Sequence, residues 1–143
     1  MEPLTDSLVS LLQRVARLES AWMQPRLAKH NITLAEFRLA GLLVGEKTGL
    51  TQRELAERLS VSGATVSVAL RGLEARGVVV RTPDANDARV KRVKLTASRR
   101  RTDRARALIE ELEEVSLATV SARDVAVAKR VLRRMADNLD AST

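Results

Sequence analysis

Two amphipathic helical segments follow each other with only two residues between them, and this spacing constrains the fold more than any other feature of the sequence. The first, 51–59, opens with the capping-box pattern Thr-Gln-Arg-Glu, whose threonine and glutamate side chains bond backbone N–H groups at a helix start. The second, 62–76, has Ser62 in position to cap it and Gly77 in position to end it. Because so short a connection forces the helices to cross, the pair has helix-turn-helix spacing.

The hydrophobic period changes after this pair. Residues 78–80 are consecutive valines, 83–87 carry the proline, aspartate and asparagine typical of turns, and 90–95 alternates cations with valine and leucine. We therefore predict a β-hairpin whose second strand has a basic outer face.

Helical periodicity covers the rest of the chain. Apolar residues from Leu4 to Trp22 predict a long first helix that Pro25 ends or bends, and a second capping box at 33–36 opens a helix that runs to about Glu46. Two more helices are predicted after Thr96 and from 121 onward. The expected fold is mainly α with a small β-hairpin, in one domain, 1–143, with two lobes.

Positive charge is confined to the middle of the sequence. The formal net charge is +7, from 25 Lys and Arg against 18 Asp and Glu. Residues 51–104 hold 13 of these cations and 6 anions, so this segment accounts for the whole excess. Such an asymmetry is typical of a surface that binds a polyanion, because neutralised phosphates release condensed counterions. The alternative is a solvated basic surface that serves solubility.

Composition excludes several other classes of protein. The chain has no Cys, no Tyr and one His, which excludes disulfide frameworks, thiolate or multi-histidine metal sites and cysteine nucleophiles. Its carboxylate pairs at 110–111 and 113–114 spread over the outside of a helix, and no glycine-rich phosphate loop is present. The longest apolar run, 39–45, is far shorter than a membrane span, and the N-terminus lacks a secretory pattern. We expect a cytoplasmic protein without enzyme activity, cofactor, metal or membrane contact.

The segment 62–76 has two different faces. Val66, Leu70 and Leu73 define a buried side on a helical wheel. Arg71 suits bidentate contact with guanine, and Val68 suits contact with a thymine methyl. The alternative is that the outer side of this helix is an ordinary solvent-exposed face. The residues that we expect at a DNA groove share small or hydrogen-bonding side chains, and they are Ser62, Ala64, Thr65, Ser67, Val68 and Arg71.

A second group of candidates lies in and after the hairpin. Asp87 and Arg89 leave the same side of an extended segment, so the carboxylate is positioned to hold the guanidinium for a narrow minor groove, where negative potential is strongest. A plain surface ion pair is the alternative. Lys91 and Arg92 are further DNA candidates on this strand, and the candidate phosphate contacts are Arg53, Arg99, Arg100 and Arg101. The last three precede or open a predicted helix, where positive charge opposes the helix macrodipole, so their presence suggests a role such as phosphate contact. The alternative is that these arginines accumulated without a function.

Several of these motifs together resemble the MarR family of winged helix-turn-helix regulators. They are the sequence Leu-Ala-Glu-Arg-Leu at 55–59, the helix 62–76, and Asp-Ala-Arg at 87–89 followed by Val-Lys-Leu-Thr at 93–96. The resemblance implies a homodimer with a dimerisation lobe, 1–30 and 105–143, and a winged-helix DNA-binding lobe, 33–104. It also implies repression of transcription from pseudo-palindromic double-stranded DNA, with 62–76 as recognition helix and Arg89 as wing arginine.

Three positions depart from the family pattern. Val68 and Ala88 stand where arginine is common, and Arg99 replaces a usual glycine. These departures imply that wing insertion and phosphate contacts carry a larger share of the binding. The family also implies release by a small aromatic or phenolic effector, for which the candidate pocket residues are Trp22, Met23, His30 and Arg38. The remaining alternative is a winged-helix module that binds protein without sequence-specific DNA binding.

Overall fold

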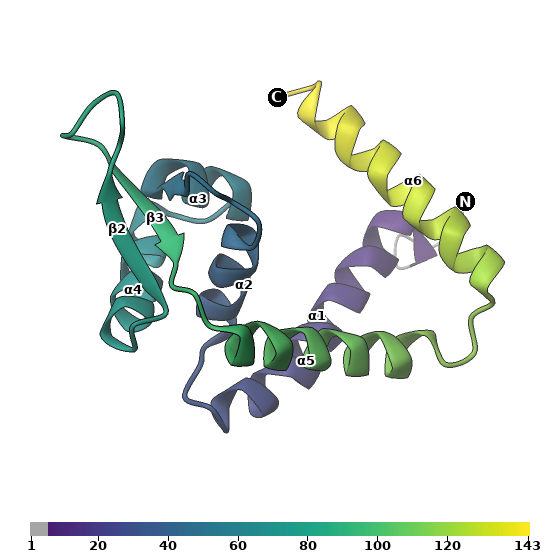
Figure 1. The fold of residues 1–143 in the computed structure, drawn as a ribbon. Helices are drawn as coiled ribbons and strands as arrows, with labels where there is room; N and C mark the ends of the chain where they lie inside the picture. The colour runs from purple at the N-terminus through teal and green to yellow at the C-terminus, as the bar shows by residue number, and fades with distance from the viewer. Residues whose placement is uncertain (1–5) are drawn as a thin grey trace. The chain divides into compact units, whose positions relative to one another are not determined.

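The computed structural model describes residues 6–143, apart from the side chain of Arg99. The expectations for Leu4 and for the first five residues of the dimerisation lobe lie outside these residues. The described chain forms six helices and three strands in two compact units, which divide after Ser98 (Figure 1). In chain order the elements are α1 (Leu8–Ala28), α2 (Leu34–Leu43), β1 (Leu50–Thr51), α3 (Gln52–Leu59), α4 (Gly63–Ala75), β2 (Val79–Pro83), β3 (Lys91–Leu95), α5 (Arg99–Leu117) and α6 (Ala122–Asp140).

Both predicted capping boxes are confirmed in the first unit. Thr33 accepts a hydrogen bond from the backbone N–H of Glu36, and the Glu36 carboxylate accepts one from the Thr33 N–H at 2.9 Å. Thr51 and Glu54 make the same reciprocal pair at the start of α3. The predicted end of α2 at Glu46 is wrong, because Val44 is extended and Gly45 takes a left-handed φ of 82°. α1 continues through Pro25 to Ala28.

The helix-turn-helix spacing is also confirmed. α3 ends at Leu59, where Ser60 takes the left-handed conformation with φ 53° and ψ 43°. α4 begins at Gly63, after three intervening residues if its cap Ser62 is counted, and the Ser62 hydroxyl accepts a hydrogen bond from the Thr65 N–H at 3.1 Å. At its other end Gly77 has φ 64°, which turns the chain into β2.

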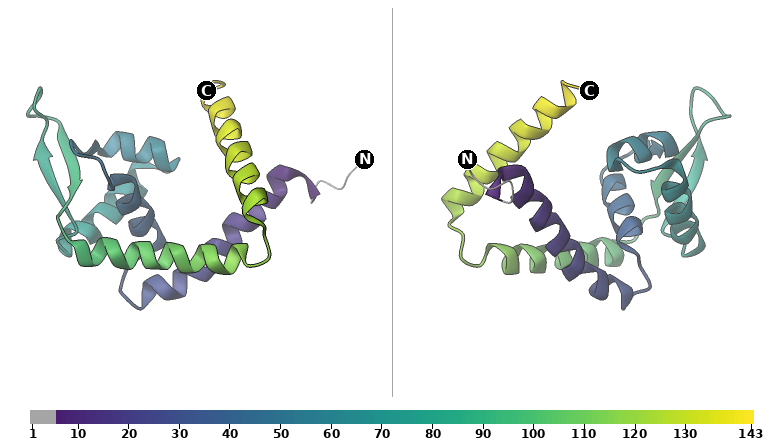
Figure 2. Two further views of the ribbon diagram at one scale, coloured as in Figure 1. Left: turned by 45° about the vertical axis from the view of Figure 1, so that its right-hand side comes forward. Right: turned by 180° about the vertical axis from the view of Figure 1, so that it is seen from behind.

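The sheet has three antiparallel strands in the order β1-β3-β2, one more than the predicted hairpin. β2 and β3 pair with Arg81 opposite Val93, and the two residues of β1 pair with the other edge of β3. Position 49, just before β1, requires a glycine. Its φ is 77°, and a Cβ there would meet the Val93 carbonyl, because the two backbones approach closely. In both figures the loop between β2 and β3 projects beyond the helices of its unit (Figures 1 and 2).

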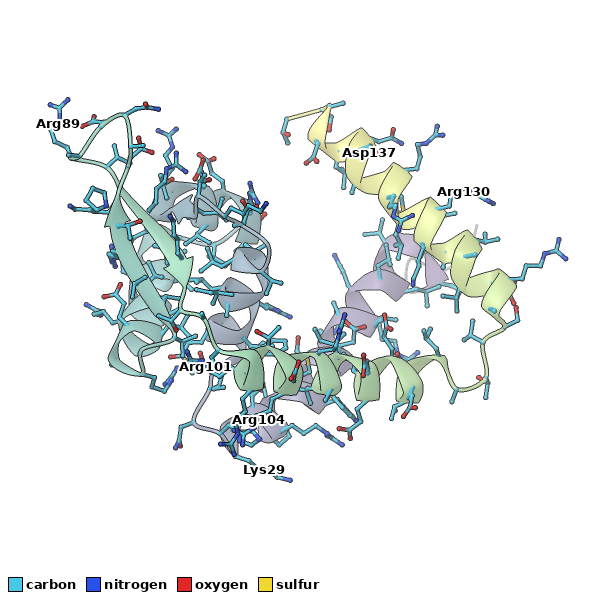
Figure 3. All side chains as sticks on the ribbon, viewed as in Figure 1. Lys29, Arg89, Arg101, Arg104, Arg130 and Asp137 are labelled. Carbon is cyan, nitrogen blue, oxygen red and sulfur yellow. The ribbon has the colours of Figure 1, made fainter. Side chains whose placement is uncertain are left out.

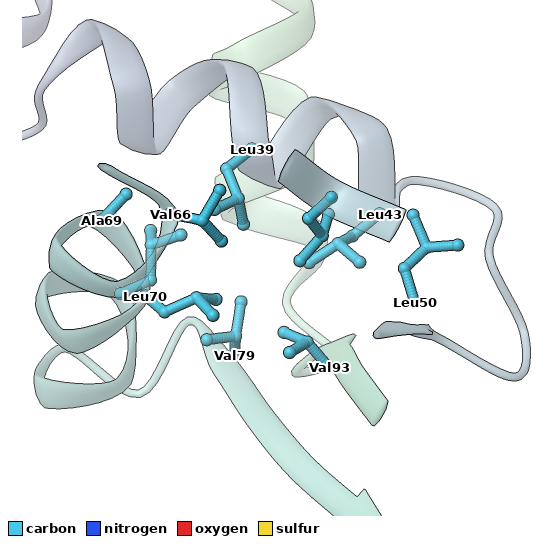
Figure 4. Close-up of a cluster of buried hydrophobic side chains, with 10 residues drawn as sticks. Leu39, Leu43, Leu50, Val66, Ala69, Leu70, Val79 and Val93 are labelled. Atoms are coloured by element: carbon cyan, nitrogen blue, oxygen red, sulfur yellow. The ribbon is translucent and has the colours of Figure 1, made fainter. Parts of the chain in front are cut away.

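One hydrophobic core holds α4 against the rest of the first unit (Figure 4). The buried face of α4 is the predicted one, since Val66 and Leu70 have no exposed surface and Leu73 is 2% exposed. Together with Ala69 of α4, these side chains form one cluster with buried residues of the other elements, Leu39, Leu43, Leu50, Leu55, Val79 and Val93. The opposite side of α4 is therefore the side left to solvent.

A buried carboxylate links α2 to the end of α4. Glu36 is 6% exposed, and besides its capping bond it accepts a hydrogen bond from the Arg76 guanidinium at 2.5 Å. Gly72 lies directly against this carboxylate, where a Cβ would overlap Glu36 Oε1. The two hydrogen bonds from Thr33 and Arg76 both hold Oε2 of this carboxylate, and a glycine at position 72 leaves room for its Oε1.

The second unit consists of α5 and α6. Ser121 caps α6 by accepting from the Asp124 N–H at 3.1 Å. None of the described side chains of α6 is buried, and Val127, Val131 and Leu132 are 38–44% exposed along one face. Within residues 6–143 no helix combines the length and apolar character that crossing a membrane requires.

Candidate nucleic-acid interface

The outer face of α4 carries the side chains that the sequence predicted for it. Ala64, Thr65 and Arg71 are exposed, Val68 is 61% exposed, and Ser67 is half-buried. Val68 belongs neither to the buried core nor to the hydrophobic side chains packed against it. Its neighbours on this face, Ala64 and Ser67, have small side chains. Such a face fits closely into a groove.

Two of these residues are engaged with each other at the start of α4. The Ser62 and Thr65 hydroxyls lie 2.9 Å apart, and Ser62 also caps the helix. Their hydroxyls therefore serve first to fix the N-terminus of α4.

A chain of hydrogen bonds that sequence reasoning missed crosses the side of this face. The Gln52 amide nitrogen lies 2.5 Å from the Ser67 hydroxyl oxygen, and the Gln52 amide oxygen accepts from the Arg81 guanidinium at 3.3 Å. Arg81 in turn bonds Glu74 at 2.6 Å. These contacts join α3, α4 and β2. The two partners of Gln52 are 15 and 29 residues away in the sequence, so no local sequence pattern predicts these contacts.

The loop between β2 and β3 presents one arginine at its tip (Figure 3). Asp84 accepts hydrogen bonds from the backbone N–H groups of Asn86 and Asp87, which folds the loop back on itself. Asp87 accepts from both the backbone N–H and the Nε of Arg89, each at 3.1 Å. The Arg89 side chain is still 92% exposed. The expected pair is present, and it fixes the start of a side chain whose guanidinium faces solvent.

Arg92 is held inside the first unit. Its guanidinium bonds the Asp84 carboxylate and the Gly49 carbonyl and lies 3.7 Å from Glu54. Its side chain is 28% exposed, so this predicted DNA contact braces the base of the loop against the start of α3. Lys91, its neighbour on β3, is exposed.

These contacts change the ionisation of the groups involved. The side-chain hydrogen bond from Arg92, followed by the Asn86 N–H, holds the pKa of Asp84 below its usual value. The same bond with Asp84 raises the pKa of Arg92. The pKa of Glu54 is lowered by the Thr51 backbone N–H first, then by the Thr51 hydroxyl and Arg92. All three groups are therefore charged at neutral pH.

We expect Arg92→Gln to lower the free energy of unfolding in a pH-dependent way. A carboxyl whose pKa is depressed by folding contributes stability above its unfolded pKa and loses it as the pH falls through the folded pKa. The difference between parent and variant is thus expected to be larger at pH 7 than at about pH 3, in urea unfolding. Arg53→Gln, which breaks only the exposed pair with Glu57, is the control. An equal difference at both pH values would contradict the brace.

Three of the candidate phosphate contacts, Arg53, Arg100 and Arg101, have exposed side chains on helices. Arg53 is 89% exposed and pairs with Glu57 at 3.0 Å. Arg100 and Arg101 are exposed in the first turn of α5, which has no acidic residue. Figure 3 labels Arg101 at this end of the helix. These side chains are accessible, and their contact with phosphate stays a prediction, as does that of Arg99.

The four candidate effector residues have different surroundings in the first unit. The Arg26 guanidinium lies 3.6 Å from the centre of the Trp22 ring, Met23 is buried, and His30 is exposed. Arg38 bonds the Ser20 hydroxyl at 3.0 Å. Arg38 also lines a cavity of about 270 Å³ within this unit, beside Leu34, Leu39, Leu59, Thr65 and Val66.

Comparison with known proteins gives this arrangement a family. Residues 30–90 match the model of the MarR family. The chain is 33% identical over 132 residues to the HTH-type transcriptional repressor Rv2887 of Mycobacterium tuberculosis, covering 90% of both chains.

Solved structures of MarR-type regulators have the same fold as this chain. The chain resembles MepR of S. aureus, from the crystal structure of a MepR–DNA complex, with a TM-score of 0.77 and 25% identity over 96% of this chain and 99% of that one. It shares the fold of a MarR transcriptional regulator from Methanosarcina mazei Go1, with a TM-score of 0.85 and 20% identity over 95% and 98% of the two chains. Taken with its helix-turn-helix and its projecting β2–β3 loop, these likenesses identify the chain as a member of the MarR family of transcriptional regulators.

Proposed function

We propose that the chain represses transcription by binding pseudo-palindromic double-stranded DNA as a homodimer in the cytoplasm. α4 enters the major groove and the β2–β3 loop reaches the adjacent minor groove. The observation that carries this proposal is the likeness to the chain in the MepR–DNA complex over 96% of the length. A two-fold dimer binds half-sites about one helical turn, roughly 34–36 Å, apart.

The two parts of the proposed interface read DNA differently. On α4, Arg71 bonds a guanine edge, Val68 contacts a thymine methyl, and the small neighbours allow close approach. In the wing loop, Arg89 enters the minor groove with Asp87 holding its Nε. Phosphate contacts then come from the exposed cations Arg53, Lys91, Arg100 and Arg101. Arg99 stays a further candidate for such a contact.

The proposed dimerisation lobe comprises 1–30 and 105–143. Apolar side chains on its helices support this assignment: Val127, Val131 and Leu132 on α6 are 38–44% exposed. On α1, Leu8 and Leu18 are 53% and 59% exposed. Large exposed apolar faces on a soluble chain of this kind indicate contact with another protein surface, here a second copy.

The proposal is tested by fluorescence anisotropy of the full chain with duplexes selected from a random pool, at about 50 mM and about 200 mM salt. A DNA-binding repressor enriches a pseudo-palindrome, and its affinity falls steeply with salt because phosphate contacts release counterions. A chain that enriches no duplex would instead support the winged-helix module that binds protein.

Arg71→Ala is expected to relax the preference for one base pair in each half-site by about tenfold, because a bidentate contact with guanine is lost. The measurement is a competition between the selected duplex and versions altered at single positions. Arg53→Ala removes the same charge from a proposed phosphate contact on α3, and as the matched control it should weaken binding to every duplex alike. A uniform loss for every sequence would make Arg71 a phosphate contact.

We further propose that a small-molecule effector releases the DNA, with Trp22, Met23, His30 and Arg38 as its candidate residues. The cavity of about 270 Å³ supports Arg38, because its lining is mostly apolar and includes Thr65 of α4. A thermal-shift panel of small aromatic acids and phenols tests this. Stabilisation of the parent that Arg38→Ala abolishes supports it, and no stabilisation by any compound argues against it.

A further inference from the structure

We infer that Gln52 is a positioning residue for Ser67. By donating a hydrogen bond to the Ser67 hydroxyl oxygen, it leaves the hydroxyl hydrogen to be donated to an acceptor on a base edge. The inference rests on the proposed function, because it assigns what one residue of α4 presents to the DNA. Gln52 itself stands at the first position of α3, outside the predicted recognition surface.

The orientation of the Gln52 amide follows from its partners. A guanidinium can only donate, so the end of the amide that faces Arg81 must be the oxygen. The opposite end, 2.5 Å from Ser67 Oγ and 3.5 Å from the Gly63 carbonyl, must then be the NH₂ group. Arg81 is itself fixed by Glu74 at 2.6 Å, so the amide has one favourable orientation.

The orientation of the amide decides the role of the serine. Because an NH₂ group can only donate, Ser67 Oγ must accept the bond from Gln52. The single hydroxyl hydrogen of Ser67 cannot point at Gln52 and is available elsewhere. Ser67 is half-buried on the exposed side of α4, between Ala64 and Arg71.

This polarity favours some bases over others. In the major groove guanine offers O6 and N7, adenine N7 and thymine O4 as acceptors, whereas cytosine offers only its amino donor. A serine without a fixed partner bonds either type. Held by Gln52, Ser67 is expected to favour an acceptor at the base that it reaches.

The variant Gln52→Glu tests this with almost no change in shape. A carboxylate keeps the contact with Arg81, and an acidic residue suits a helix start, so the fold is expected to persist in circular dichroism. The carboxylate cannot donate, so Ser67 must give its hydrogen to Glu and is left with lone pairs alone. Base preference at one position is then expected to move toward the amino donors of cytosine and adenine.

The added negative charge is separated by a double-mutant cycle with Ser67→Ala. The probe is the duplex that the parent chain enriches from a random pool, together with its single-position variants. In the parent background, Gln52→Glu is expected to cost about two- to tenfold more affinity than in the Ser67→Ala background, since one neutral hydrogen bond is lost only in the first.

The outcomes separate this inference from the proposed function. Equal losses in the two backgrounds, or an unchanged base preference in Gln52→Glu, would overturn the inference while DNA binding by the parent stands. A parent chain that enriches no duplex would overturn both.

Discussion

Arg89→Ala is expected to weaken binding to the selected duplex by about 5- to 150-fold, which corresponds to 1–3 kcal/mol. Arg89 has the most exposed of the ion-paired side chains in the β2–β3 loop, at 92%, and Asp87 fixes its Nε and backbone N–H. In the proposed complex, the DNA therefore has less of the Arg89 side chain to order when the guanidinium enters the minor groove. Neither residue belongs to the core, so the thermal stability of the variant should equal that of the parent.

Two further variants show where the effect arises. Arg123→Ala removes one positive charge from exposed surface of α6 and should change affinity little. Asp87→Ala keeps the Arg89 guanidinium but removes the carboxylate that holds it. We therefore expect this variant to lose less DNA affinity than Arg89→Ala. If Arg89→Ala binds as tightly as the parent, the wing takes no part in the mechanism.

Gly72→Ala is expected to lower the free energy of unfolding by about 1–3 kcal/mol, although alanine is the better helix former by roughly 1 kcal/mol. The two effects oppose each other, and the position of Glu36 decides between them. Glu36 is 6% exposed, and its Oε2 accepts bonds from both the Thr33 N–H and Arg76, so turning Oε1 away from a new Cβ would disturb these two bonds.

The control for this variant removes the obstacle. In a Glu36→Ala background the space beside position 72 is open, and Gly72→Ala should then stabilise the chain through helix propensity. Urea unfolding of the four chains measures both changes. A stabilising Gly72→Ala in the parent background would show that Glu36 yields easily and does not constrain α4.

Local patterns predicted the elements of the fold well. Each capping box, at Thr33 and at Thr51, is a pattern of four consecutive residues, and the buried face of α4 follows from helical spacing alone. β1 was missed because two residues show no alternation, and they were already explained as part of a helix cap. The end of α2 was misplaced because Val44 continues the apolar run while its backbone is already extended.

The candidate interface was predicted less completely, because its contacts join distant segments. The pair of Asp87 and Arg89 is local and was found. Arg92 was grouped with exposed cations, yet its partners Asp84, Glu54 and Gly49 come from other parts of the first unit. Charge in a sequence shows which residues can bind a polyanion, and only the fold shows which of them are occupied by internal carboxylates.

Hydroxyl-radical footprinting of the full chain on its selected duplex tests the central claim most directly. Two copies reading DNA with α4 and the wing predict two protected half-sites about one helical turn apart, with flanking minor-groove protection that disappears in Arg89→Ala. Even protection along the duplex, or flanking protection that survives this substitution, would contradict the account.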